Sequence, residues 1–153
     1  MLDQHIRNGT PVTFGELYAE VMQFYAEHMH LLDSGAATEW AETFCADGTF
    51  DVPTLPAPVQ GRAALAAAIR HAAEQQAKAG EVHRHWHGMV AITPHDDGTL
   101  AVRCYALVFA TARGGDTRLH RACVCEDVLT RTEGALRVRS RRVTRDDGFT
   151  LPS

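Results

Sequence analysis

The first part of the chain carries apolar residues at helical spacing. The apolar positions between residues 14 and 33 are Leu17, Val21, Phe24, Tyr25, Met29 and Leu32. This spacing predicts a long amphipathic helix that buries one face. Thr13 precedes the stretch and Glu16 follows three residues later, a pair typical of a capping box at a helix start.

Two more helices and an N-terminal arm complete the first half. A short helix is expected over 37–44, and an alanine-rich helix over 62–78 that ends before a glycine. Residues 1–12 are polar and contain Gly9 and Pro11, so we interpret them as a flexible arm. A single domain is expected over 13–148.

A short strand is expected over 49–52, after a turn at 46–48. Three prolines make the stretch that follows it a loop. The second half of the chain then changes from helical spacing to the alternation typical of strands. Short turns with Asp or Gly separate the later strands. These strands are expected over 82–93, 100–113, 118–132 and 136–144.

Helices followed by a run of strands are an α+β order rather than a βαβ order. We therefore expect a cone-shaped, barrel-like fold in which three N-terminal helices pack on a strongly curved, mainly antiparallel sheet. Long antiparallel strands beside helices would curl one sheet face around them and leave a hollow. That hollow is the predicted place for a small, largely apolar molecule.

Composition and charge exclude several classes of function. Of 153 residues, 45% are hydrophobic and 22% charged, the balance of an ordinary globular protein. The formal net charge of -4 offers no broad positive field, so no nucleic-acid partner is expected. No segment approaches the roughly 20 continuous apolar residues of a membrane span. No signal peptide is recognisable, and the four cysteines form no CxxC pattern, so we expect a cytoplasmic protein with reduced thiols.

Three alternating histidines form the strongest candidate for chemistry. His83, His85 and His87 would share one face of a strand, with Arg84 and Trp86 on the other. Imidazoles facing a hollow suit proton transfer at neutral pH. Solvated strand-edge histidines are the alternative. A metal site on this strand is a further alternative, because alternating histidines can bind zinc or iron.

A second candidate group lies at the end of the first helix. His30 and Asp33 are three residues apart, which puts them on roughly the same side. Asp33 could instead cap the helix end. Aromatic walls with polar tips suit a flat, ring-bearing ligand, although core packing explains most such residues equally well. The expected pocket-wall residues are Tyr25, Phe50, Trp86, Met89, Tyr105 and Phe109.

The order of these pieces resembles the nuclear transport factor 2-like superfamily, and within it the SnoaL-like polyketide cyclase and dehydratase branch. The similar segments begin with His30-Leu-Leu-Asp-Ser-Gly and Trp40-Ala-Glu-Thr-Phe-Cys-Ala-Asp-Gly-Thr-Phe. Gly61-Arg-Ala-Ala-Leu, Arg84-His85 and the closing hairpin from Glu126 follow. Together they span about residues 14–146.

The resemblance implies an enzyme that acts on an aromatic polyketide or similar intermediate without a cofactor or a metal. His85 falls where related dehydratases keep a pocket histidine, and His30 takes the place of their aspartate, with Asp33 one turn on. The expected catalytic residues are His85, Asp33, His30 and Tyr105. The expected substrate-binding residues are Tyr25, Met29, Phe50, His87, Met89 and Cys125.

The resemblance also leaves a different class of function open. A ring-hydroxylating dioxygenase small subunit shares the scaffold, and there the cone would serve binding or subunit assembly while the histidines would be incidental. Dimerisation through the outer sheet face is common in such folds, and Arg84 and Trp86 could supply that surface. We therefore expect a homodimer with a hydrophobic or aromatic small-molecule substrate.

Overall fold

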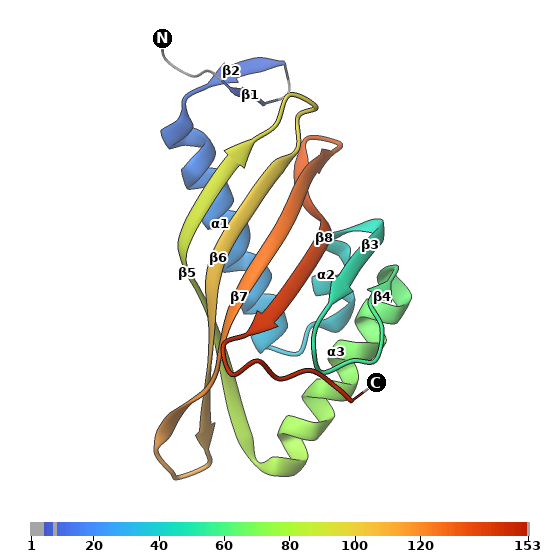
Figure 1. Ribbon diagram of the computed structural model, residues 1–153, viewed down its shortest axis with the longest axis vertical. Helices are drawn as coiled ribbons and strands as arrows, with labels where there is room; N and C mark the ends of the chain where they lie inside the picture. Colours follow the sequence, from blue (N-terminus) through green and yellow to red (C-terminus); the bar gives the residue numbers. More distant parts are fainter. Residues whose placement is uncertain (1–4, 8, 153) are drawn as a thin grey trace.

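A computed structural model describes residues 5–7 and 9–152 of the chain (Figure 1). Three helices lie against a six-stranded, mostly antiparallel sheet, which confirms the expected α+β class. The helices are α1 (Phe14–Asp33), α2 (Ala37–Glu42) and α3 (Arg62–Ala79). The strands of the sheet are β3 (Phe44–Asp51), β4 (Val59–Gln60), β5 (Glu81–Pro94), β6 (Leu100–Ala112), β7 (Thr117–Thr132) and β8 (Ala135–Arg145).

Helix α1 begins at the predicted capping box. The Thr13 hydroxyl oxygen accepts from the Glu16 backbone N–H at 3.2 Å, and Glu16 Oε2 accepts from the Thr13 N–H at 2.7 Å. These bonds satisfy amide groups that have no partner inside the helix. At the other end, Gly35 has a φ of 74° that favours glycine and lets the chain turn back into α2.

The sheet has the strand order β4-β3-β8-β7-β6-β5. Strands β5 to β8 are the expected meander, and each neighbouring pair is antiparallel. Strand β3 adds to β8 in the parallel direction, with an irregularity between Phe44 and Thr49. The segment 46–48, expected as a turn, is therefore part of a longer strand, and the helix expected over 37–44 ends at Glu42.

A bulge divides β5 into two halves with opposite alternation. The pairing with β6 shifts between Gly88 and Ala91, and Met89 has a positive φ of 52°. Before the bulge, the odd-numbered residues face the interior, and after it the even-numbered Val90 and Ile92 do. One extra residue in a strand reverses which side chains face inward.

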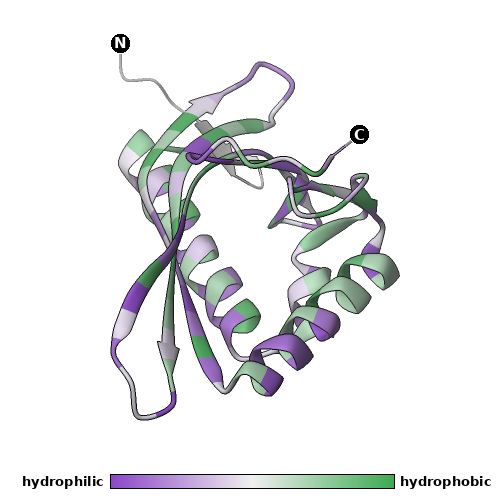
Figure 2. Cartoon of the chain, turned by 60° about the horizontal axis from the view of Figure 1, so that its bottom comes forward, coloured by the Kyte–Doolittle hydropathy of each residue, from purple (hydrophilic) through white to green (hydrophobic). Residues whose placement is uncertain are grey.

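Helix α3 carries few bulky side chains on its inner side. Leu65, Ala66 and Ile69 are buried, but the other residues along the helix are mostly alanine or polar. Alanine favours the helix without filling the space in front of it. The sheet arches around one side of the interior and the helices complete the other (Figure 2). Small side chains on α3 therefore leave room between helix and sheet.

The N-terminal segment contains regular structure where a loose arm was expected. Strands β1 (His5–Arg7) and β2 (Thr10–Val12) pair antiparallel, with Gly9 at a φ of 78° in the turn. Residues 1–4 and 8 of the expected arm lie outside the described residues. Within the described part of the chain, no helix combines the length and the apolar character that a membrane crossing requires.

Candidate functional site

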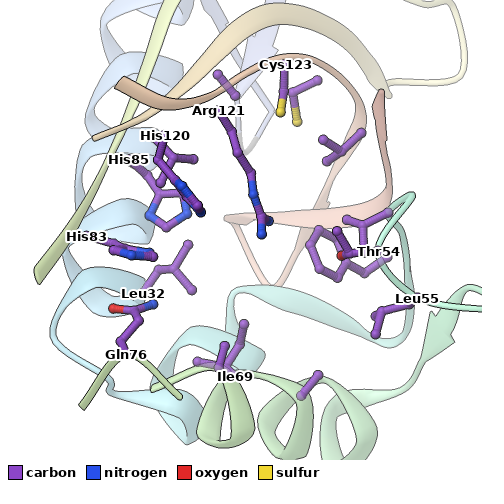
Figure 3. A pocket seen from close by; sticks show the side chains of 18 of the residues that line it. Leu32, Thr54, Leu55, Ile69, Gln76, His83, His85, His120, Arg121 and Cys123 are labelled. Atoms are coloured by element: carbon purple, nitrogen blue, oxygen red, sulfur yellow. The ribbon is translucent and has the colours of Figure 1, made fainter. Parts of the chain in front are cut away.

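A cavity of about 570 Å³ lies between the inner face of the sheet and helices α1 and α3 (Figure 3). Its polar residues come chiefly from β5 and β7, and Figure 3 shows His83, His85 and His120 together on one wall with Arg121 reaching across. Leu32, Leu55 and Ile69 line the apolar parts. The cavity therefore has a wall of imidazoles and guanidinium groups opposite a mainly apolar surface.

His85 and Asp33 form a direct pair at the cavity wall. Asp33 Oδ1 lies 2.6 Å from His85 Nδ1, and Asp33 Oδ2 accepts from the His85 backbone N–H at 3.0 Å. Because a carboxylate only accepts, the hydrogen-bond network assigns a proton to Nδ1 and leaves Nε2 as the ring nitrogen for other partners. The His85 side chain is 23% exposed and the Asp33 side chain 9%. The pair joins the last turn of α1 to β5 and can exchange protons.

His83 belongs to a separate group near the end of β5. Its Nε2 lies 2.9 Å from Glu81 Oε2, and Arg118 donates to the other Glu81 oxygen, also at 2.9 Å. The hydrogen bond with His83 and then that with Arg118 lower the pKa of Glu81. The His120 ring lies 5.1 Å from that of His83, and partial burial lowers the pKa of His120. His83 and His85 therefore have different partners, and within the described part of the chain they do not belong to a group spaced for a metal ion with His87.

His87 contacts Cys104 and lies near Cys125 instead. Its Nδ1 lies 3.6 Å from Cys104 Sγ, and Cys104 is hydrogen-bonded to Cys125. One ligand atom of each of these three residues lies within 4.8 Å of the others. The interaction with Cys125, followed by the contact with His87, lowers the pKa of Cys104 to about 5, although burial opposes the shift. The interaction with Cys104 and burial raise the pKa of Cys125, whose thiol donates to Asp127 Oδ1 at 3.4 Å.

A fully buried ionic network lies behind these cysteines. Arg141 donates to both oxygens of Asp127, at 2.9 and 2.8 Å, and the Tyr25 hydroxyl donates to Asp127 at 2.6 Å. Burial alone would raise the pKa of Asp127, but the charge and hydrogen bonds of Arg141 outweigh it and lower that pKa. Burial and the nearby carboxylate raise the pKa of Tyr25. The network keeps its charges paired inside the core.

His28 extends this network toward α2. Arg141 Nη1 lies 2.8 Å from His28 Nε2, and His28 Nδ1 lies 2.6 Å from the Thr43 hydroxyl. Because arginine can only donate, His28 accepts at Nε2 and donates from Nδ1 to Thr43, whose hydroxyl donates to the Trp40 carbonyl oxygen. Burial, and then the charge of Arg141, lower the pKa of His28. His28 is therefore a neutral structural residue.

The structure brings several of the predicted site residues to the cavity. Met29, Phe50, His85, His87 and Cys125 line it. Asp33 reaches it through His85.

Tyr25 does not line the cavity. It is 2% exposed and belongs to the ionic network, with its ring 5.3 Å from that of His87. Its hydroxyl has Asp127 as partner, so Tyr25 supports the cavity wall from behind.

Three predicted site residues lie away from the cavity. Tyr105 is 52% exposed on the outer face, because the even-numbered residues of β6 face inward. Met89 is 78% exposed, because the β5 bulge turns it outward. His30 is exposed because Met29 and Asp33, four residues apart, occupy the inner side of the last turn of α1. The expectation that these three residues face the pocket is wrong. The same holds for Trp86, which is 65% exposed, and for Phe109, an odd-numbered residue of β6.

Other cavity residues were not predicted from the sequence. Arg121 and His71 line the cavity, and Cys104 lies directly behind its wall. His120 on β7 also lines the cavity. Alternation along β6 and β7 could have identified Cys104 as inward-facing, whereas the position of His71 depends on how α3 packs.

Comparisons with solved structures agree on the fold over most of the chain. Aln2 from a Streptomyces species is 38% identical, with 86% of this chain and 92% of Aln2 covered and a TM-score of 0.80. ActVI-ORFA from Streptomyces coelicolor is 30% identical, with 90% and 99% covered and a TM-score of 0.81. A protein from Catenulispora acidiphila in complex with S-DNPA is 36% identical, with 87% and 96% covered and a TM-score of 0.75.

A comparison with curated proteins gives no match. The SnoaL-like domain matches residues 15–142, which extend from the first turn of α1 into β8. The match includes both partners of the Asp33–His85 pair. It also includes strands β3 to β7 and most of β8. The chain therefore belongs to the SnoaL-like domain family.

Proposed function

We propose that the protein is a cofactor-independent cyclase, dehydratase or isomerase that acts on an aromatic polyketide or a similar natural-product intermediate. The contact of 2.6 Å between His85 Nδ1 and Asp33 Oδ1 at the cavity wall carries this proposal. Membership in the SnoaL-like domain family supports the same type of enzyme.

His85 would move the proton in this reaction. Its Nε2 takes a proton from carbon beside a carbonyl or from a hydroxyl group, and Asp33 stabilises the imidazolium that forms. The imidazolium then returns the proton to the departing hydroxyl, which leaves as water, or to another position of the product. Taking the proton and returning it involve only the substrate and the Asp33–His85 pair, so no external oxidant or reductant is required.

Arg121 takes the role that the sequence assigned to Tyr105. The guanidinium reaches into the cavity, and among the described residues no carboxylate pairs with it (Figure 3). A donor aimed at developing charge stabilises an enolate oxygen. The substrate would lay its apolar rings against α3 and turn its oxygen-bearing edge to Arg121 and His85. A volume of about 570 Å³ lies in the range of small-molecule sites.

The alternative of a binding or assembly module without chemistry is less well supported. In such a module the histidines would need no orienting partner and no access to the cavity. His85 has both, since Asp33 holds one ring nitrogen while the side chain remains partly exposed.

The test compares wild type with His85→Gln and Asp33→Asn on aromatic hydroxy-ketones that can close a ring or lose water. Product formation is followed by mass spectrometry. Each variant should lower the rate about 10²–10⁴-fold, the usual contribution of acid–base catalysis. Wild-type rates in His85→Gln would overturn the acid–base role.

S-DNPA, the ligand bound by the relative from Catenulispora acidiphila, is the first binding probe. We expect it to shift the NMR signals of His85 and His87 in wild type. His30→Gln is a matched control, since His30 is exposed and outside the cavity. Binding that leaves the cavity histidines unchanged would contradict the assigned pocket.

We also propose that a second copy of the chain covers the outer face of the sheet. Val82, Trp86, Tyr105 and Leu119 lie on strands β5 to β7 and are each at least half exposed. Such a cluster of large apolar side chains is typical of an interaction surface. Trp86→Asp should shift the sedimentation of the protein from dimer to monomer, and a wild-type monomer would contradict the proposal.

A further inference from the structure

We propose that His87, Cys104 and Cys125 form a binding site for one Zn²⁺ ion in the cavity wall, with a fourth coordination position open to the cavity. The three ligand atoms lie within 4.8 Å of one another, and His87 Nδ1 is 3.6 Å from Cys104 Sγ. Among the described residues this is the only group of three His, Cys, Asp or Glu side chains with such spacing. The proposed acid–base reaction does not require this ion.

The geometry is close to that of a tetrahedral zinc site. Zinc bonds of about 2.3 Å to sulfur and 2.0–2.1 Å to nitrogen place neighbouring ligand atoms roughly 3.3–3.8 Å apart. The distance between His87 and Cys104 already falls in that range. The wider separations in the group need to close by about 1 Å at most, which small side-chain rotations supply.

Three neighbouring strands hold the ligands. Cys104 and Cys125 are direct partners across β6 and β7, and His87 on β5 pairs with Ala106, two residues from Cys104. Paired strands keep facing side chains close, so the donors are brought together before any ion arrives. Both cysteines are 1% exposed.

Charge at the site balances when zinc is bound. Both sulfurs bind as thiolates, and two thiolates neutralise one Zn²⁺ ion. Cys125 then gives up the hydrogen bond of 3.4 Å that its thiol donates to Asp127 Oδ1, while Asp127 keeps its ion pair with Arg141, so no net charge is buried. Sulfur and imidazole donors favour zinc over magnesium or calcium, which take oxygen ligands.

The site is distinct from the acid–base pair. His85 Nδ1 is engaged by Asp33 and His83 by Glu81, whereas His87 contacts Cys104 and lies near Cys125. His87 and Cys125 line the cavity, so the open position of the ion faces a bound substrate. Three protein ligands with one open position are the arrangement of catalytic zinc sites, in which the metal polarises a substrate oxygen.

The experiment titrates Co²⁺ into the full-length, reduced and chelator-treated protein. One equivalent should produce a near-ultraviolet thiolate-to-cobalt band and the visible bands of tetrahedral cobalt, and Zn²⁺ should abolish both. Zn²⁺ affinity is measured by competition with a coloured chelator. Cys104→Ser and Cys125→Ser should each weaken it at least about 100-fold, since losing even a supporting contact to a ligand costs 10–100-fold.

Two variants serve as controls. Cys123 is buried on the same strand and lines the same cavity, but it lies outside the ligand group, so Cys123→Ser should keep the cobalt spectrum. His85→Asn should keep it as well. If a serine variant fails to fold by circular dichroism, His87→Asn takes its place, with the same expected loss.

Several outcomes would overturn the proposal. They are the absence of a thiolate band in wild type, a band that persists in Cys104→Ser and Cys125→Ser, or one lost in Cys123→Ser. Loss of the band in His85→Asn would show that the ion needs His85 and would equally reject a site built from His87, Cys104 and Cys125.

Discussion

Asp33 and Asp127 are both acidic residues beside the same sheet, yet their surroundings differ. Asp127 is held by Arg141 and Tyr25, and all these groups are buried. Asp33 has His85 as its ring partner, and that ring lines the cavity. A carboxylate with a complete set of buried partners supports the core, whereas one paired with an accessible imidazole can serve proton transfer.

The two imidazoles of these clusters show the same contrast. His28 uses both ring nitrogens, one toward Arg141 and one toward Thr43, and it is fully buried. His85 uses one nitrogen and keeps 23% of its side chain exposed. The number of ring nitrogens already engaged therefore separates a structural histidine from a candidate catalytic one.

The largest expected effect comes from breaking the buried ion pair. Asp127→Asn leaves the Arg141 guanidinium buried without its counter-charge. We expect the free energy of unfolding to fall by about 3–5 kcal/mol, as measured by urea denaturation. A change below about 1 kcal/mol would show that water or another group compensates Arg141.

The second effect is a pH dependence set by His28. Its pKa is lowered in the folded protein, so the unfolded chain binds more protons below its ordinary pKa of about 6.5. Stability should therefore be complete above that pH and fall below it, by up to about 1.4 kcal/mol per pH unit.

His28→Gln isolates this contribution, because an amide can still accept from Arg141 and donate to Thr43. Its urea unfolding at pH 7.5 and 5.5 should show a shallower loss than wild type. His120, whose pKa is also lowered, contributes equally to both proteins and cancels. Parallel pH curves would contradict a neutral, buried His28.

The smallest effect on the free energy of unfolding is expected at the cavity. Asp33→Asn removes a pair whose histidine is partly exposed, so unfolding should change by no more than about 1 kcal/mol. The same variant should strongly lower the rate of the proposed reaction. A stability loss as large as that of Asp127→Asn would place Asp33 among the structural residues and remove the contrast.

Local sequence patterns were sufficient to predict most helices and strands and part of the candidate site. Helical spacing and the Thr13–Glu16 capping box located α1, and alternation placed His83, His85 and His87 on one inner face. The same alternation places Tyr105 on the outer face, since the inward residues of β6 have even numbers. An aromatic ring with a hydroxyl suits a pocket wall, but the position of Tyr105 in the strand decides the side it faces.

Other features depend on contacts that are distant in sequence. The bulge that turns Met89 outward reflects the pairing of β5 with β6, and the parallel addition of β3 to β8 pairs residues more than ninety positions apart, such as Phe44 with Val138. No local pattern reports either of them. Asp127 and Arg141 are direct partners across β7 and β8, but the complete burial of their ion pair follows from the packing of α1 onto the sheet.

The sequence by itself determined the helices, the strand alternation and the inner face that carries the histidines, because these follow from local hydrogen bonding and period. Only the tertiary structure decided which histidine meets Asp33, which one is locked beside Arg141, and that His87 meets Cys104 and Cys125. Those contacts depend on strand register and on the small side chains of α3. A shift of a single residue in register would have separated them.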